Sequence, residues 1–388
     1  MIIERKHDLE RVRRLVKSFP VTAILGPRQC GKTFLSKQVK ADHYFDLESP
    51  RDLAAFYQPQ LLLEKLQGTI IIDEIQRCPE LFLVLRYLVD NHPKQKYLIL
   101  GSASGVLLRQ SSESLAGRIA YYYLGGFNLY DVGQKNVQKL WLRGGFPRSF
   151  LARSAYESQQ WLNQYLTTFL EKDIPQLGIS IPSQTLRRFW MMLSHYHGQV
   201  INFSEIGRSF GVSDMTVRKY IDILESTFMI RTLQPWHNNL GKRLIKRPKI
   251  YLKDSGLLHR LFTIEEEKDL WTHPQVGSSW EGFALEEVLR RLGLKSQEVF
   301  FWGTHSGAEL DLFWKAKGKH WGVEFKYGDA PKLTKSMQSA VSDLQLSHLW
   351  VIYPGEKTYP LTPKITATPL NTMKGVNSSH GIIDFMRS

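Results

Sequence analysis

One eight-residue motif limits the folds open to this chain: Gly26-Pro27-Arg28-Gln29-Cys30-Gly31-Lys32-Thr33. It fits the pattern G-x-x-x-x-G-K-[ST]. The apolar, partly β-branched run Val21–Leu25 before it predicts a short buried strand, and Phe34–Lys40 after it predicts a helix. A strand, a glycine-containing loop and a helix in this order are typical of a phosphate-binding loop. An ordinary glycine-containing turn is the alternative.

The residue types in this motif suit the binding of a nucleotide triphosphate. Gly26 and Gly31 permit backbone conformations that let successive N–H groups surround a phosphate. The N-terminus of the following helix adds a partial positive charge. We expect Lys32 to reach the β- and γ-phosphates and the Thr33 hydroxyl to bind Mg²⁺. The predicted cofactors are therefore ATP and Mg²⁺.

A second motif consists of two acidic residues, Asp73 and Glu74, which directly follow the apolar run Thr69–Ile72. Continuous apolar runs are typical of parallel strands covered on both faces, and ligands bind at the carboxyl ends of such strands. Asp73 could complete the Mg²⁺ shell, and Glu74 could polarise the water that attacks the γ-phosphate. Alternatively, the two acids are a helix N-cap and a first-turn acid.

Two further polar residues border the next predicted strands. Ser102 ends the buried strand that begins at Lys96, where it could hydrogen-bond the γ-phosphate or the attacking water, or only cap a helix. Arg118 precedes Ile119–Leu124, which we interpret as a fifth strand; His43–Leu47 is predicted to be the second strand.

The order of these motifs resembles that of the AAA+ ATPases. The resemblance implies that Arg118 reaches the nucleotide of a neighbouring subunit as an arginine finger, so that the working unit is a homo-oligomer, a hexameric ring being one form. Otherwise Arg118 is a surface residue paired with a nearby acid. The resemblance also makes the helical residues 128–197 a lid. Trp141–Pro147, Glu171–Ile174 and Lys249–Leu258 resemble a narrower bacterial and archaeal group of AAA+ ATPases that carry an uncharacterised C-terminal region.

The composition points to an anionic partner inside the cell. The chain contains 51 Lys and Arg and 37 Asp and Glu, which gives a net charge of +14 and a pI near 9.6. DNA is the first candidate partner. A membrane is not expected, because no apolar run approaches the ~18 residues of a membrane-spanning helix. The start of the sequence lacks the apolar core of a signal peptide, and two cysteines suit a reducing cytoplasm.

Residues 198–262 predict a winged helix. Ile201–Ser213 and Asp214–Leu224 match two helices joined by a glycine-containing turn, and Met229–Leu233 could begin a wing. The second helix would carry the groove or phosphate contacts of Thr216, Arg218 and Lys219. Winged helices also serve as protein-packing modules, which leaves that alternative open.

A basic run without acids follows the predicted winged helix. It contains Lys242, Arg243, Lys246, Arg247 and Lys249. Such a run is often a solvated face, but after a winged helix it is better explained as a surface that tracks DNA phosphates.

The last third of the sequence holds a second candidate site. Glu309–Trp314 and Gly322–Lys326 alternate polar and apolar residues, with Gly318 at the expected turn of a hairpin. Asp311 and Glu324 would share one face and could bind Mg²⁺, with Lys326 beside them. This resembles the D…ExK signature of the PD-(D/E)xK nuclease fold. In that fold Glu281 would be the additional acid; Glu286 or Glu287 are alternatives.

We therefore predict an α/β protein of four parts: an AAA+ core with a parallel sheet (1–127), a helical lid (128–197), a winged helix (198–262) and a restriction-endonuclease-like domain (263–388). The predicted function is an ATP-hydrolysing, DNA-binding motor or remodeller in repair, recombination or defence. The alternatives are an ATP-dependent Mg²⁺ nuclease and a signalling or protein-remodelling ATPase.

Overall fold

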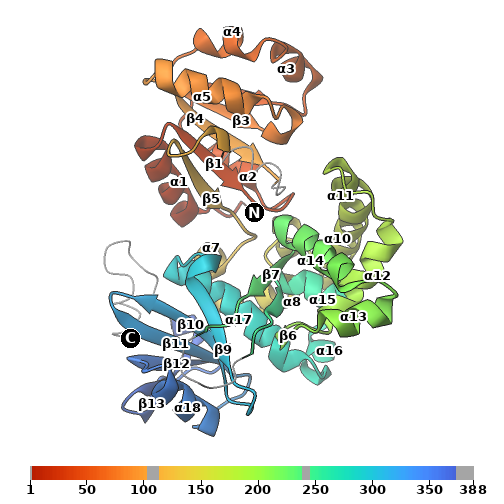
Figure 1. Cartoon of the computed structure of the whole chain (residues 1–388), viewed down its shortest axis with the longest axis vertical. Helices are drawn as coiled ribbons and strands as arrows, with labels where there is room; N and C mark the ends of the chain where they lie inside the picture. The colour runs from red at the N-terminus through yellow and green to blue at the C-terminus, as the bar shows by residue number, and fades with distance from the viewer. Residues whose placement is uncertain (1, 103–112, 238–244, 373–388) are drawn as a thin grey trace. The chain divides into compact units, whose positions relative to one another are not determined.

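The computed structural model describes residues 2–102, 113–237 and 245–372. These residues form two compact α/β units, drawn in Figure 1. The first unit extends to residue 132 and includes 145–151 and 226–229, and the second contains 133–144, 152–225 and the chain from 230 onward. The three later parts predicted from the sequence thus fall largely within one compact unit. The reason is that α15 (Ser255–Leu261) packs against helices from both the predicted lid and the C-terminal domain.

The first unit is built on a parallel sheet with the strand order β2-β3-β4-β1-β5. Every residue of β1 is buried, and β3 and β4 are buried after their first residue. Burial on both faces explains their continuous apolar sequences. The five predicted strands are confirmed as β1 (Val21–Leu25), β2 (His43–Asp46), β3 (Thr69–Asp73), β4 (Lys96–Gly101) and β5 (Ile119–Tyr123).

Helices flank this sheet, and α1 packs against β1 and β4 (Figure 1). The helix after the glycine loop is shorter than predicted: it ends at Ser36 instead of Lys40. Gln38 and Val39 donate to carbonyls three residues earlier, so the chain leaves the α-helix through tight turns. The helices are α1 (Lys6–Ser18), α2 (Lys32–Ser36), α3 (Pro50–Ala55), α4 (Pro59–Glu64), α5 (Leu81–Asn91), α7 (Leu129–Val132) and α9 (Pro147–Phe150), with the 3₁₀ turn η1 (Ile75–Arg77).

The second unit begins with packed helices and short helical turns. The sequence Ser154-x-x-Glu157 starts α10, because Ser154 Oγ accepts from the Glu157 N–H. The elements are η2 (Gln134–Asn136), α8 (Val137–Arg143), α10 (Ala155–Thr168), the π-helical turn η3 (Phe169–Asp173), α11 (Ile174–Gln176), α12 (Ser183–Ser194), α13 (Phe203–Phe210), α14 (Asp214–Ser226), α15, and α16 (Glu267–Thr272).

Helices α13 and α14 form the predicted pair joined by a turn. Gly211 ends α13 in the left-handed region with φ 69°, and Ser213 Oγ accepts the Thr216 N–H at 3.2 Å. The pair is accompanied by a small antiparallel sheet of order β6-β8-β7. Its strands are β6 (Gln199–Val200), β7 (Ile230–Leu233) and β8 (Lys249–Leu252).

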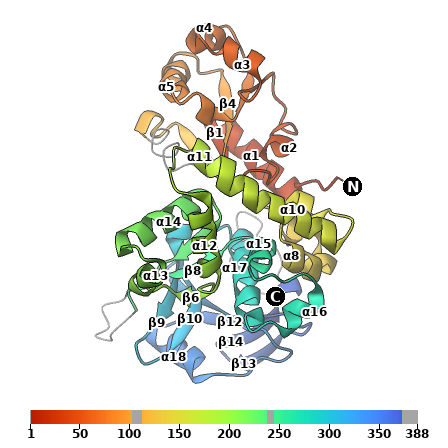
Figure 2. The ribbon, with the colours of Figure 1, turned by 90° about the vertical axis from the view of Figure 1, so that its right-hand side faces the viewer.

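A mixed six-stranded sheet of order β13-β14-β12-β11-β10-β9 completes the second unit. The hairpin β10–β11 turns at Lys317 and Gly318, which both have positive φ, as the glycine predicted. Helices α17 and α18 lie on opposite sides of this sheet (Figure 2). The elements are α17 (Val276–Leu292), η4 (Ser296–Glu298), β9 (Val299–Gly303), β10 (Glu309–Ala316), β11 (Lys319–Phe325), α18 (Lys335–Asp343), β12 (His348–Tyr353), β13 (Tyr359–Thr362), β14 (Ile365–Pro369) and η5 (Leu370–Thr372).

Among the described helices, none combines the length and the apolar character needed to cross a membrane.

Candidate nucleotide site and C-terminal carboxylate cluster

The glycine loop, residues 26–33, connects β1 to α2 as the sequence predicted. Gly31 has φ 102°, a backbone conformation that side-chain-bearing residues rarely adopt. A Cβ at Gly26 would lie 2.0 Å from the Leu124 carbonyl oxygen. Both glycines are therefore required by the local geometry of the loop.

The polar residues of the loop gather with the acid that ends β3. Thr33 Oγ1 donates to Asp73 Oδ2 at 2.7 Å. Lys32 Nζ donates to the carbonyls of Gly26 and Pro27, at 3.0 and 2.9 Å. A hydroxyl beside a carboxylate is a donor set that suits Mg²⁺ when nucleotide phosphates supply further oxygens. Thr33 and Asp73 would therefore hold a Mg²⁺ ion carried by ATP.

Glu74 follows Asp73 at the carboxyl end of the sheet, in the left-handed region with φ 56°. Its carboxylate accepts a hydrogen bond from Gln76 Nε2, and the same amide donates to Ser102 Oγ at 3.0 Å. Burial raises the pKa of Glu74, and the charge of Lys32 opposes that shift. The carboxylate of Glu74 makes no side-chain cap hydrogen bond, and its role toward the attacking water stays a prediction.

Three residues that the sequence analysis did not select support this site. Tyr44 Oη donates to Asp73 Oδ2 at 2.9 Å, and Gln76 links Glu74 to Ser102. Buried Arg5 donates to the Cys30 carbonyl at 3.1 Å, beneath the glycine loop. The pairing of β2 with β3 brings Tyr44 close to Asp73, but nothing in the local sequence predicts that pairing. The spacing D-E-x-Q could have drawn attention to Gln76.

Arg118 lies just before β5 and pairs with an acid of its own chain. Its Nε and Nη2 atoms donate to Asp90 Oδ1 and Oδ2 at 2.7 and 2.9 Å. Asp90 belongs to α5, and both side chains remain partly exposed. This is the surface pairing that the sequence left open as the alternative to a finger, and a role toward a second subunit stays a prediction.

The second candidate site lies on the β10–β11 hairpin. The register pairs Leu312 with Val323, so Asp311 and Glu324 are neighbours across the two strands and both are buried. Glu324 Oε1 contacts Lys326 Nζ at 2.7 Å. Burial and the charge of Asp311 raise the pKa of Glu324 to about 8. The structure therefore brings the residues of the D…ExK pattern together.

Glu281 of α17 is the additional acid at this place. Its Oε1 accepts from Tyr251 Oη at 2.6 Å, and burial together with the charge of Asp311 raises its pKa to about 7. The alternatives Glu286 and Glu287 make other contacts. Glu286 instead pairs with Arg231 at 2.5 Å, and Glu287 contacts Arg290 at 3.8 Å. We call Glu281, Glu309, Asp311 and Glu324 the carboxylate cluster.

Lys249 does not belong to a basic surface that tracks DNA phosphates, and for this residue the prediction from the sequence is wrong. It is only 2% exposed and its ammonium contacts Glu281 and Asp311 at 3.3 and 3.0 Å, and also Glu309. Strand β8 starts at this residue and turns its side chain into the carboxylate cluster, so it cannot track a phosphate backbone. Sequence spacing alone could not place it there.

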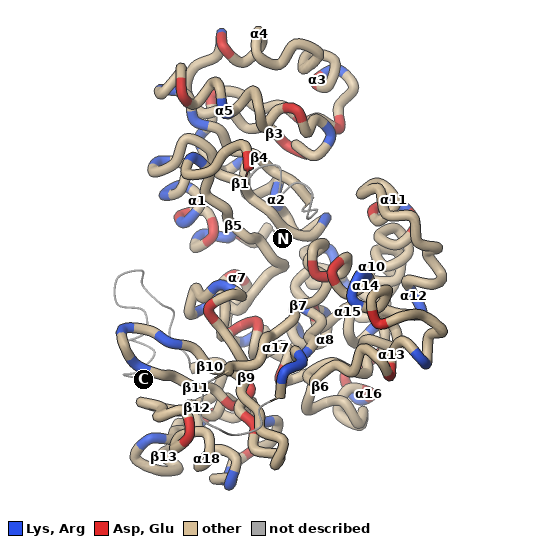
Figure 3. Tube along the Cα trace, in the orientation of Figure 1, with Lys and Arg blue, Asp and Glu red and all other residues tan. Residues whose placement is uncertain are grey.

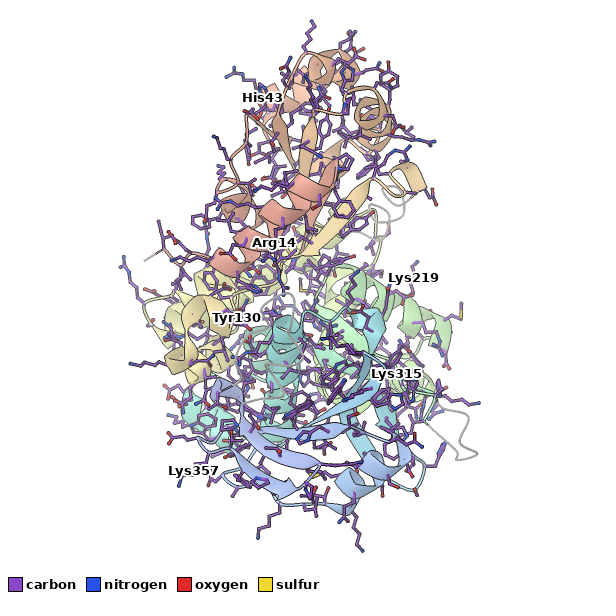
Figure 4. The ribbon with its side chains drawn as sticks, turned by 90° about the vertical axis from the view of Figure 1, so that its left-hand side faces the viewer. Arg14, His43, Tyr130, Lys219, Lys315 and Lys357 are labelled. Carbon is purple, nitrogen blue, oxygen red and sulfur yellow. The ribbon has the colours of Figure 1, made fainter. Side chains whose placement is uncertain are left out.

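The other predicted DNA-binding residues lie on the surface or outside the described residues. On α14, Arg218 and Lys219 are exposed and Thr216 is partly buried; Figure 4 shows Lys219 at the edge of the ribbon. The Arg218 guanidinium stacks 3.8 Å from the Phe203 ring. Lys246 and Arg247 are exposed. The two remaining residues, Lys242 and Arg243, lie outside the described part of the chain.

Comparisons with known proteins identify the type of domain that forms most of the first unit. Residues 18–132 match a family model described as an AAA domain. Residues 134–268 and 276–373 match two models each described as a domain of unknown function, DUF8612 and DUF4143. Over its whole length the chain is 44% identical to uncharacterised proteins of Mycobacterium bovis (Mb2031c) and Mycobacterium tuberculosis (Rv2008c), and it covers 88% of each. The chain belongs to their family. With its AAA domain, this family member is a P-loop ATPase of the AAA+ kind.

Two solved structures resemble parts of the fold of this AAA+ family member. One is the Walker-type ATPase paby2304 of Pyrococcus abyssi, with 14% identity and a TM-score of 0.45, covering 67% of this chain and 96% of that one. The other is RIF2 of Saccharomyces cerevisiae, with 11% identity and a TM-score of 0.25, covering 43% and 71%.

Proposed function

We propose that this AAA+ ATPase is a motor or remodeller that binds DNA while it hydrolyses ATP. The DNA-binding part of the proposal depends on the second unit. Helices α13 and α14 with the sheet β6-β8-β7 have the element order of a winged helix. The observation that carries the proposal is the exposure of Lys219, Lys246 and Arg247 on and next to these elements.

The nucleotide site supplies the chemistry of hydrolysis. Lys32 would neutralise the phosphates, and Thr33 and Asp73, which are hydrogen-bonded to each other, would hold a Mg²⁺ ion that supplies further positive charge to the phosphate oxygens. Glu74 would orient the attacking water and take its proton, and Ser102 is held close to Glu74 through Gln76. Hydrolysis then changes which nucleotide the glycine loop binds, and α2 begins within this loop.

The overall charge supports DNA as the partner. The chain carries +14, and Lys and Arg are distributed over both units in Figure 3. Such a field favours association with a polyanion, although it carries no sequence specificity. We place the acting form in the cytoplasm as a homo-oligomeric ring, with Arg118 at the subunit boundary.

The test is DNA affinity as a function of salt concentration. Replacing Lys242, Arg243, Lys246 and Arg247 with Ala should weaken binding to every DNA sequence alike. It should also reduce the slope of log K against log salt by about one unit per lost phosphate contact. ATP turnover without DNA should be unchanged. Turnover measured with single-stranded, duplex and branched DNA then identifies the preferred substrate.

A matched control removes the same charge from another surface. Replacing exposed Lys332, Lys335, Lys357 and Lys364 with Ala should leave the salt slope of DNA binding unchanged. An equal loss of DNA affinity in both variants would contradict the proposed DNA-binding surface and would indicate only a general effect of net charge. A wild-type protein that binds no DNA at low salt would instead favour the signalling or protein-remodelling ATPase.

An ATP-dependent Mg²⁺ nuclease is the second candidate function. It is favoured by one observation: the second unit brings Asp311 and Glu324 together with Lys326, as in the PD-(D/E)xK nuclease fold. A nuclease would cleave DNA in Mg²⁺, and Glu324→Ala with Lys326→Ala would abolish that cleavage. The motor predicts no cleavage by the wild type.

A further inference from the structure

The carboxylate cluster already contains a cation that the chain itself supplies. Lys249 Nζ lies 3.0 Å from Asp311 Oδ1 and 3.3 Å from Glu281 Oε1, and it also contacts Glu309. Tyr251, which also lies on β8, donates to the same Glu281 oxygen at 2.6 Å. Strand β8 thus inserts two hydrogen-bond donors between α17 and β10.

The remaining oxygens of the two hairpin acids are mostly engaged. Asp311 Oδ2 accepts the Phe325 N–H at 3.0 Å, and Glu324 Oε1 is paired with Lys326. Glu324 Oε2 is buried without a hydrogen-bond partner in the described structure. A Mg²⁺ ion requires about six oxygens in near-octahedral order at ~2.1 Å. The two hairpin acids thus leave one carboxylate oxygen unengaged, which does not by itself provide that arrangement.

The possible metal-binding side chains of the described residues lead to the same conclusion. Within residues 2–102, 113–237 and 245–372, no three His, Cys, Asp or Glu side chains are grouped so that they could hold a metal ion. The acids of the carboxylate cluster are near one another in the fold, but three of them contact the ammonium group of Lys249. Contacts of about 3 Å are those of charge-assisted hydrogen bonds, and the same lone pairs cannot also bind a metal.

We infer that Lys249 is the resident cation of the carboxylate cluster and takes the place of the divalent metal that the nuclease-like fold implies. The second unit therefore carries the arrangement of a nuclease site without its metal. Lys249 instead fastens the small sheet β6-β8-β7 to β10 and α17. This inference goes beyond the proposed function, holds whether or not the chain binds DNA, and opposes the Mg²⁺ nuclease that is the second candidate function.

Metal binding to the full-length chain tests this inference. All proteins carry Asp73→Asn, which removes the carboxylate expected to bind the metal at the nucleotide site, and Mn²⁺ uptake is followed by electron paramagnetic resonance without nucleotide. We expect no site on the otherwise wild-type chain. Lys249→Met removes the charge with little change in volume and should create one Mn²⁺ site per chain. Lys249→Arg keeps a cation and should create none.

The new site must depend on the carboxylates. Adding Asp311→Asn and Glu324→Gln to Lys249→Met should abolish the gained Mn²⁺ site. If Lys249→Met binds no Mn²⁺ although it folds, Lys249 is not what excludes the metal and the inference is wrong.

A second measurement does not depend on the stability of a Lys249 variant. Mn²⁺ is titrated into the chain with native Lys249, with and without Asp311→Asn. Uptake that Asp311→Asn removes would overturn the inference, whereas equal absence of uptake in both proteins supports it. Failure of DNA binding in the salt experiment would leave this result unaffected.

Discussion

At the scale of single residues, the Asp73 carboxylate accepts three hydrogen bonds in the nucleotide site. Its Oδ2 atom accepts from Thr33 at 2.7 Å and Tyr44 at 2.9 Å, and Oδ1 accepts the Glu74 N–H at 2.9 Å. These donors hold the carboxylate in one orientation. A Mg²⁺ ion depends on that orientation, because it tolerates little distortion of its octahedral shell.

Tyr44→Phe tests whether this orientation matters. It removes one hydrogen bond to a charged group, worth about 1.5–3 kcal/mol. We expect ATPase activity to require about ten times more Mg²⁺ for half-maximal rate. The control is Tyr57→Phe at a side chain that is 89% exposed. Identical Mg²⁺ titrations for wild type and Tyr44→Phe would show that Tyr44 has no positioning role.

Lys32 and Glu74 should fail in different ways. Lys32→Ala removes the cation of the glycine loop, so binding of a fluorescent ATP analogue should be lost together with turnover. Glu74→Gln should retain that binding and lose turnover, because the attacking water has no base. Equilibrium binding and phosphate release measured on the same preparations separate the two. Normal phosphate release by Glu74→Gln would exclude it as the base.

At the scale of elements, a buried ion pair joins β7 to α17. Arg231 Nε and Nη2 contact the Glu286 carboxylate at 2.5 and 3.0 Å, and both side chains are at least nine-tenths buried. Burial alone would raise the pKa of Glu286, but the Arg231 guanidinium outweighs it and lowers the pKa to about 2. The pair therefore fixes how the small sheet lies on the helix, because neither charge can be left alone.

This ion pair predicts how stability depends on pH. A depressed carboxyl pKa stabilises the folded state above the unfolded value of 4.5, and that stability is lost as the pH falls toward about 2. The loss amounts to up to about 3 kcal/mol in the free energy of unfolding. Urea unfolding between these pH values measures it. Arg231→Met with Glu286→Leu should flatten the slope, while Arg231→Met alone should cost about 3–5 kcal/mol at neutral pH.

The exposed pair Lys268–Glu266, at 2.9 Å with both side chains more than half exposed, provides the control. Lys268→Met, which keeps the Glu266 side chain that caps α16, should change neither the stability nor its pH slope appreciably, because solvent screens such pairs. An unchanged slope in the Arg231/Glu286 double variant would show that other carboxyls govern the acid unfolding.

At the scale of the whole molecule, the open question is whether one chain completes its own nucleotide site. Arg118 is bonded to Asp90 in its own chain, on the exposed surface of the first unit. Surface pairs of this kind are weak, so a transition-state phosphoryl group in a second subunit could compete for the guanidinium.

Mixing two inactive variants tests this arrangement. Arg118→Ala should slow hydrolysis by roughly 10³ with little change in ATP affinity. If Arg118 acts in trans, mixing Arg118→Ala with Glu74→Gln creates some interfaces with both native residues, and ATPase activity should partly return. Asp90→Ala is the control, because it removes the intrachain partner and should keep activity. No recovery in subunits shown to co-assemble would exclude a finger in trans.

Where the sequence patterns are local, they predicted the structure well. The glycine loop, the five strands of the first sheet and the turn at Gly318 all depend on residues close in sequence. A glycine with positive φ or an apolar strand buried on both faces restricts the backbone whatever surrounds it. For the same reason the D-E pair could be placed at the carboxyl end of β3 before any fold was known.

The sequence by itself determined the AAA+ core and the residues of its glycine loop, while only the tertiary structure decided which charges meet. The sequence predicted Lys249 to be part of a basic surface that tracks DNA phosphates, yet β8 carries it into the carboxylate cluster. Arg231 likewise finds Glu286, 55 residues away in sequence. Such pairings follow from how strands and helices pack, because burying an ion is favourable only when the fold brings its counter-ion within hydrogen-bonding distance.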